Sequence, residues 1–139
     1  MTDNYFRLSE GGPMGFANVF FIQAIVGCVD LLPQNEYCIA IFEEMKRIGE
    51  NGGFEVPPQE KKSYSKPWAD FVQAVIDRKI DDPICKSFFN GATVFPCNAQ
   101  ADQYDFSISQ RAFDETTMEG KFQDATERFG KVMEQLLHQ

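Results

Sequence analysis

Residues 14–32 form the most hydrophobic stretch of the chain, and the polar residues within it are Asn18, Gln23 and Asp30. A helix that is apolar around most of its circumference is either the central helix of a bundle or a membrane span. Three polar residues, two glycines and the lack of a basic flank argue against a span. We therefore expect a buried helix that ends at Pro33.

A second helix is expected between residues 35 and 49. Asn35 is a favourable N-cap, and the apolar residues after it recur at steps of three and four, which places them on one helical face. These residues are Cys38, Ile41, Phe42, Met45 and Ile48. The other side carries Glu43 and Glu44. Because the link at Pro33 is short, we expect the two helices to pack antiparallel.

Two further helices are expected in the middle of the chain. Residues 67–80 carry an apolar stripe around Trp68. Asp82 and Pro83 combine a helix cap with a proline at the first helical position, so a short helix should follow them. Residues 49–66 contain glycines, a proline pair and charged residues, and this composition predicts an exposed loop.

The last helix is expected over residues 114–137. Its apolar residues alternate between steps of four and three, and they are Met118, Phe122, Ala125, Phe129, Val132 and Leu136. Such a seam packs either against its own domain or against a second copy of the chain. The seam is shorter than the three to four heptads typical of a coiled coil, so packing within the domain is favoured. A homodimer through residues 114–137 is the alternative.

One strand is predicted near residue 106, because Tyr104, Phe106 and Ile108 alternate with polar residues. A strand needs a partner, and the candidates are residues 54–56 and 93–95. Together these patterns predict a mainly α fold, a single-domain bundle of about five helices with a small β element. Residues 13–139 would form this helical domain, and the polar residues 1–12 a flexible N-terminal arm.

The charge balance indicates the class of partner. The chain has 13 basic and 21 acidic residues and a net charge of −8. Nucleic-acid binding requires clustered lysine and arginine, so this class is disfavoured. An acidic chain instead favours another protein as partner, and a basic one. The candidate partner-binding residues lie in acidic or loop segments and are Glu43, Glu44, Phe54, Glu55, Asp102 and Asp105.

The sequence predicts no catalytic site, metal site or cofactor. The one histidine, His138, is next to the last residue, which disfavours triads, histidine metal sites and haem ligation. The cysteines do not form the close pairs, about two to four residues apart, that are typical of zinc knuckles. Neighbouring carboxylates such as Glu43 and Glu44 point in different directions on a helix. We therefore expect a non-enzymatic protein.

The four cysteines are candidates for disulfide bonds. Cys28 and Cys38 stand at similar distances from the Pro33 corner and could meet across it, and Cys97 could bridge to Cys85. The alternative is that the cysteines are free, buried and small hydrophobic residues. The N-terminus has no basic start followed by a short apolar core, which favours the cytoplasm, where thiols stay reduced. In an oxidising compartment two disulfides could form.

One family resemblance can be traced through short motifs. Residues 21–30 (FIQAIVGCVD), 37–39 (YCI) and 95–97 (FPC), with a helix around Ala74 and Val75 between them, resemble small helical immunity proteins of the Tai type from bacterial type VI secretion. The resemblance covers residues 21–97. It implies a helical, often dimeric periplasmic protein that blocks a secreted toxin.

The leading functional hypothesis is therefore a protein-binding protein, most specifically a toxin-neutralising immunity or inhibitor protein. One alternative is an accessory structural subunit of a larger mitochondrial or membrane-associated complex, because Cys28 and Cys38 resemble half of a twin-cysteine helical hairpin. Another is an acidic inhibitor that mimics nucleic acid, in which carboxylates such as Asp102 and Asp105 stand in for phosphates.

Overall fold

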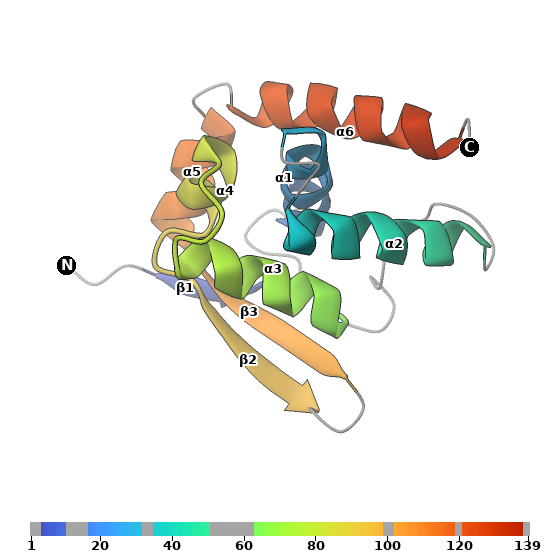
Figure 1. Cartoon of the computed structure of the whole chain (residues 1–139). Coiled ribbons are helices and arrows are strands. Elements are labelled where there is room, and N and C mark those ends of the chain that lie inside the picture. Colours follow the sequence, from blue (N-terminus) through green and yellow to red (C-terminus); the bar gives the residue numbers. More distant parts are fainter. Residues whose placement is uncertain are drawn as a thin grey trace.

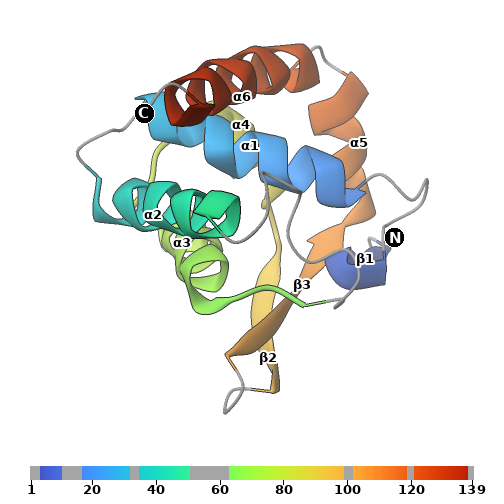
Figure 2. The ribbon, with the colours of Figure 1, turned by 90° about the vertical axis from the view of Figure 1, so that its right-hand side faces the viewer.

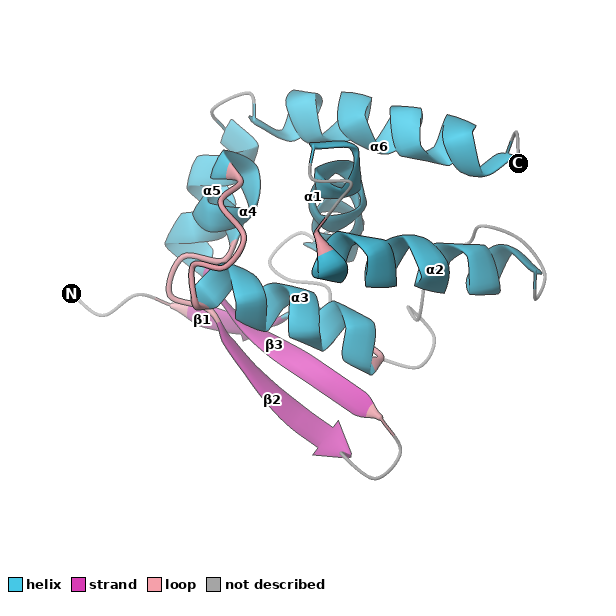
Figure 3. Cartoon of the chain, in the orientation of Figure 1, coloured by secondary structure: helices cyan, strands magenta, loops and turns pink. Residues whose placement is uncertain are grey.

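A computed structural model describes residues 4–10, 17–31, 35–50, 63–98, 102–118 and 121–137. These residues form six α-helices and a three-stranded antiparallel sheet, so the predicted mainly α fold with a small β element is confirmed (Figures 1 and 3). In chain order the elements are β1 (Tyr5–Arg7), a 3-10 turn η1 (Leu8–Glu10), α1 (Ala17–Leu31), α2 (Glu36–Glu50), α3 (Lys66–Ile76), α4 (Pro83–Phe88), β2 (Thr93–Asn98), β3 (Gln103–Ser109), α5 (Gln110–Met118) and α6 (Lys121–Leu137).

Helix α1 is the central helix, as its composition predicts. It lies between α6 on one side and α2 on the other (Figures 1 and 2). Phe21, Ile22, Ile25 and Val26 are all buried. None of the helices in the described ranges is long and apolar enough to cross a membrane.

Helix α2 begins where the N-cap predicts. The Asn35 Oδ1 accepts the backbone N–H of Tyr37 at 2.8 Å and that of Cys38 at 3.4 Å. The expected antiparallel packing is wrong, however. Figure 1 shows α1 along its axis while α2 runs across the view, and the two exchange these aspects in Figure 2, so the helices cross steeply. A short link fixes how close two helix ends lie, but side-chain packing sets their crossing angle.

The helix expected over residues 114–137 is two helices. Helix α5 already starts at Gln110, and α6 starts at Lys121, with Gly120 between their bounds. The apolar seam of α6 packs against α1, and its residues Ala125, Val132 and Leu136 are buried there. These three seam residues therefore pack within their own chain, and the homodimer through residues 114–137 stays a prediction.

The sheet has the order β1-β3-β2. Strand β3 is the strand predicted by alternation, and β2 is one of its two candidate partners, with Val94 opposite Phe106. The other candidate, residues 54–56, lies outside the described residues. On its other edge β3 pairs with β1, where Phe6 faces Ile108.

Strand β1 corrects the expectation of a flexible N-terminal arm. Tyr5–Arg7 pairs with β3, and Leu8 in η1 is buried. Because residues 1–12 are mostly polar, their composition does not indicate the short edge strand Tyr5–Arg7 or the buried side chain of Leu8. At least residues 5–8 therefore belong to the folded body.

The exposed loop expected over residues 49–66 is also partly corrected. Helix α2 continues to Glu50, and residues 51–62 lie outside the described part of the chain. Tyr64 is buried and forms an isolated antiparallel bridge with Tyr104. Its hydroxyl donates to Asn18 Oδ1 on α1. A single aromatic residue therefore fixes the end of this segment to both the sheet and the central helix.

Aromatic rings connect the sheet to the helices. The Phe21 ring on α1 lies 4.7 Å from Tyr64, 5.1 Å from Phe106 on β3 and 5.8 Å from Phe89, between ring centroids. Trp68 on α3 lies 6.0 Å from the same ring. Edge-to-face and tilted ring pairs at these distances add stability beyond the area they bury. Among the described residues, most phenylalanines are therefore buried in the core or packed against it.

A close approach between α1 and α6 yields a testable prediction. A Cβ on Gly27 would lie 2.8 Å from the Arg128 Cβ and 3.2 Å from the Ala125 carbonyl oxygen, so Gly27→Ala must push α6 away. We expect it to lower the free energy of unfolding by about 1–3 kcal/mol, as overpacking does. Urea denaturation followed by circular dichroism measures the change.

Gly130 on α6 supplies the matched control. A Cβ there would meet nothing within 4 Å. Gly130→Ala should therefore leave stability unchanged or raise it by up to about 1 kcal/mol through helix propensity. Equal destabilisation by the two substitutions would contradict the close approach at Gly27.

Candidate functional site

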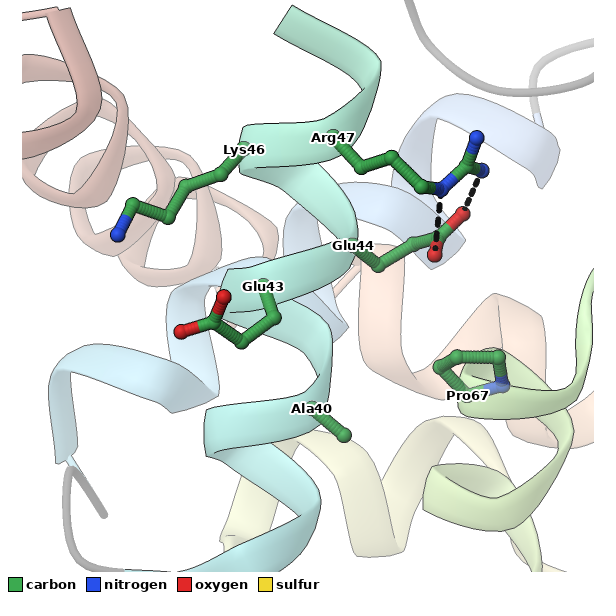
Figure 4. A pocket seen from close by; sticks show the side chains of 6 residues that line it. All are labelled: Ala40, Glu43, Glu44, Lys46, Arg47 and Pro67. Carbon is green, nitrogen blue, oxygen red and sulfur yellow. Dashed lines mark hydrogen bonds and ion pairs between the residues drawn. The ribbon is translucent and has the colours of Figure 1, made fainter. Parts of the chain in front are cut away.

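Two of the predicted partner-binding residues lie beside a shallow surface hollow of about 500 Å³. The hollow lies between α2 and the start of α3 (Figure 4). Its lining residues are Ala40, Glu43, Glu44, Lys46, Arg47 and Pro67. Helical periodicity explains why α2 residues dominate, since the same helix buries Cys38, Ile41 and Met45 on its opposite side.

Glu44 and Arg47 form one wall of the hollow. The Arg47 Nε donates to Glu44 Oε2 at 3.2 Å, and its Nη2 donates to Oε1 (Figure 4). This hydrogen bond, and the negative charge of Glu44, raise the pKa of Arg47. The Ser65 hydroxyl also donates to Glu44, at 3.4 Å. Glu44 is therefore engaged with its own chain.

Glu43 differs from Glu44. Its side chain is exposed and points away from the Glu44–Arg47 pair in Figure 4. No hydrogen bond or ion pair joins its carboxylate to another residue in the described ranges. The same holds for Glu36, which lies two helical turns earlier on α2. Ile39 lies on the same side and is 46% exposed. We call Glu36, Ile39, Ala40, Glu43 and Arg47 the outer face of α2.

The other predicted partner-binding residues are dispersed. Phe54 and Glu55 lie outside the described residues. Asp102 is exposed, and its carboxylate accepts the backbone N–H of Lys66 at the start of α3 at 3.2 Å. Asp105 is buried and accepts the Ser9 hydroxyl at 2.7 Å and the Ser9 backbone N–H at 3.1 Å. Asp105 fixes η1 to the sheet and is not available to a partner or as a phosphate mimic.

The four cysteines are free, so the disulfide pairings considered from the sequence are absent. Cys85 is buried on α4, whereas Cys97 is exposed near the end of β2. Cys28 and Cys38 are both buried and do lie close together, and the Cys38 thiol donates to the Cys28 carbonyl at 3.9 Å. The alternative that the cysteines pack as small hydrophobic residues holds for three of the four.

Cys28, Cys38 and Cys85 form one cluster with Asp82, which we call the thiol cluster. Ligand atoms of Cys28, Asp82 and Cys85 all lie within 4.8 Å of one another. The Asp82 carboxylate caps α4 by accepting the Cys85 backbone N–H at 3.0 Å, as the Asp-Pro motif predicts. The closeness of Cys28 and Cys38 is expected from their similar distances to Pro33, but no sequence pattern indicates that α4 brings Cys85 and Asp82 to them.

Asp82 also accepts a charged hydrogen bond from α6. The Arg128 Nη1 lies 2.8 Å from Asp82 Oδ1, and the two side chains are 15% and 1% exposed. Arg128 bonds Asp124 as well, at 3.0 Å. A buried carboxylate is costly unless it is paired and hydrogen-bonded, and Asp82 meets both conditions.

The thiols are held in their protonated form. The hydrogen bond from Cys38 favours the Cys28 thiolate, but the hydrogen bond to Cys85 and burial outweigh it, so the pKa of Cys28 is raised. The hydrogen bond to Cys28, and then burial, raise the pKa of Cys38. The hydrogen bond to Cys28 lowers the pKa of Cys85, but burial and the charge of Asp82 outweigh this effect, so the pKa of Cys85 is raised overall. These thiols lack the lowered pKa of an activated nucleophile.

Thiol reactivity tests this arrangement. With a chelator present, an aromatic disulfide reagent should modify one thiol of the native chain rapidly, because only Cys97 is exposed. All four should react after unfolding without reductant. Cys97→Ser should remove the rapid phase. A denatured count below four would show a disulfide, and two rapid thiols would place a second cysteine at the surface.

The Arg128–Asp82 pair gives a second test. Arg128→Met leaves a buried carboxylate without its cationic partner and should lower the free energy of unfolding by about 3 kcal/mol. Arg47→Met breaks the pair of an arginine that is 60% exposed, and should cost about 0–1 kcal/mol. Adding Asp82→Asn to Arg128→Met should recover part of the loss. Urea unfolding measures all three, and similar costs for Arg47→Met and Arg128→Met would contradict the assignment.

Comparison with known proteins adds no relative to this picture. The chain matches no protein-family model, no curated protein and no solved structure. The Tai-type resemblance is therefore neither supported nor opposed by these comparisons.

Proposed function

We propose that this protein is a non-enzymatic binding protein that uses the outer face of α2 to contact a basic segment of another protein. The observation that carries the proposal is the pairing of exposed Ile39 with the carboxylates of Glu36 and Glu43, which no described residue neutralises. The apolar side chain of Ile39 is 46% exposed and can serve as an anchor that a partner buries. Acidic groups around it give a polar rim, the usual anatomy of a protein interface.

Electrostatics supports a basic partner. The chain carries a net charge of −8, and complementary charge steers association and excludes partners of the wrong sign. The hollow beside α2 adds a concave surface in which a side chain of the partner can lie. Arg47 does not offset Glu43, because its guanidinium is bound to Glu44.

A role in binding also fits the state of the reactive groups. Asp82 and Asp105 are each engaged in hydrogen bonds inside the protein. The three clustered thiols are buried, and their raised pKa values keep them protonated. Within the binding class we retain the toxin-neutralising immunity or inhibitor role that the sequence resemblance implies. Such a protein needs a stable body and one face complementary to its target.

A paired capture and affinity experiment tests this proposal. The full chain and an Ile39→Ser/Glu43→Lys variant are used to capture proteins from native lysate, and the captured protein is then purified and titrated by calorimetry. We expect the variant to bind at least about tenfold more weakly, a loss of about 1.4 kcal/mol. Added salt should weaken binding of the wild-type chain, because charged contacts are screened.

The control is Glu115→Lys on α5, an exposed residue on a helix at the far side of α1 from α2 (Figures 1 and 2). It makes the same charge change as Glu43→Lys and should leave the affinity close to that of the wild-type chain. Equal weakening by both variants would reduce the effect to net charge. Unchanged binding by the α2 variant would exclude the outer face of α2 as the contact surface.

A further inference from the structure

The thiol cluster lies away from the outer face of α2 and has the composition of a metal site. Cys28 comes from the last turns of α1, Cys38 from the first turn of α2, and Cys85 from α4, with Asp82 as the α4 cap. The three cysteines are 0% exposed and Asp82 is 1% exposed. Four potential ligands from three helices thus converge in the interior.

The spacing of the ligand atoms is close to that of a tetrahedral site. The Cys28 and Cys85 sulfurs and an Asp82 carboxylate oxygen lie within 4.8 Å of one another. Around zinc, with Zn–S near 2.3 Å and Zn–O near 2.1 Å, neighbouring ligand atoms are roughly 3.3–3.8 Å apart. Side-chain shifts of about 1 Å would close the difference. The Cys38 thiol is hydrogen-bonded to Cys28 but lies outside the set of ligand atoms that are all within 4.8 Å of one another.

We propose that Cys28, Cys85 and Asp82 bind a zinc ion, with Cys38 as the fourth ligand, in a closed structural site. Soft thiolate donors select zinc over the hard cations magnesium and calcium. Four protein ligands leave no open position, which is the pattern of a structural rather than a catalytic zinc site.

Arg128 completes the site as an outer partner. Three thiolates and one carboxylate exceed the charge of the zinc ion, and the Arg128 guanidinium 2.8 Å from Asp82 Oδ1 offsets part of the excess. Its hydrogen bond also holds the carboxylate in one orientation, as outer-shell partners of metal ligands do. Asp82 Oδ2 accepts one N–H bond, and a carboxylate oxygen has a further lone pair for the metal.

Metal binding has a defined proton balance. The three thiols are protonated in the metal-free chain, so each S–H bond breaks as a Zn–S bond forms. Three protons then pass to the solvent for every zinc ion bound, and no oxidant or reductant takes part. Affinity should therefore rise with pH.

The test uses the full chain with zinc and cobalt as probes. The protein is unfolded under reducing conditions, refolded with Co²⁺, and freed from excess metal by gel filtration. We expect one Co²⁺ per chain, with the visible absorption of a tetrahedral site and thiolate-to-cobalt charge-transfer bands, and displacement of both by Zn²⁺. Absence of these bands would overturn the proposal.

Cysteine variants assign the ligands. Cys28→Ser and Cys85→Ser should lose the tetrahedral spectrum, and Cys38→Ser should keep the metal with weaker charge-transfer bands. Cys97→Ser is the matched control, since Cys97 is exposed on β2 and outside the cluster. If Cys97→Ser loses as much metal as Cys28→Ser, the assignment fails.

A measurement on the wild-type chain removes any dependence on the folding of variants. Zinc titration of refolded protein by calorimetry, in two buffers of different ionisation enthalpy, counts the protons released. We expect three protons for each zinc ion. A stoichiometry near zero, or binding without proton release, would show that the three thiols serve only as small packed side chains.

Discussion

The fold depends on how closely α6 crosses α1. Gly27 has no side chain. The backbone of α6 and the Cβ of Arg128 can therefore approach α1 at a point where the Cβ of any larger residue would clash with them. From that position Arg128 reaches Asp82, the cap of α4, which is almost completely buried. Without the guanidinium the carboxylate would be a buried, unpaired charge, among the most destabilising features a core can have. One close approach therefore fixes the relative positions of α1, α4 and α6.

Local patterns predicted most of the elements but few of their long-range relations. The apolar run of α1, the Asn35 and Asp82 caps and the alternation of β3 are each encoded by near neighbours in sequence, and each is confirmed. The prediction that α1 and α2 pack antiparallel is wrong because their crossing angle depends on which side chains meet between the two helices. The pairing of Tyr5–Arg7 with β3 was missed for a similar reason, since a three-residue strand has too few positions to show alternation.

The candidate site shows the same division. The exposure of Glu43 could be predicted because the polar side of an amphipathic helix faces solvent. Asp105 was expected to be available to a partner but is buried. The alternation in β3 tells which residues share a face of the strand, but it does not tell that Ser9 in η1 covers Asp105. The approach of Cys28 to Cys38 could be predicted from their distances to Pro33, but the approach of Cys85 and Asp82 could not, because spacing rules for metal sites describe ligands that are close in sequence. Three helices instead bring single cysteines together from distant parts of the chain.

Helix α2 connects the two proposals through adjacent residues. Cys38 faces the interior beside Cys28, and Ile39, the next residue, faces solvent on the outer face. Successive residues of a helix differ by about 100° in direction, so fixing one fixes the other. A ligand bond to Cys38 would hold the first turn of α2 against α1 and α4, and with it Glu36 and Ile39. Because a preformed surface loses less conformational entropy on association, such a bond would favour partner binding without touching the partner.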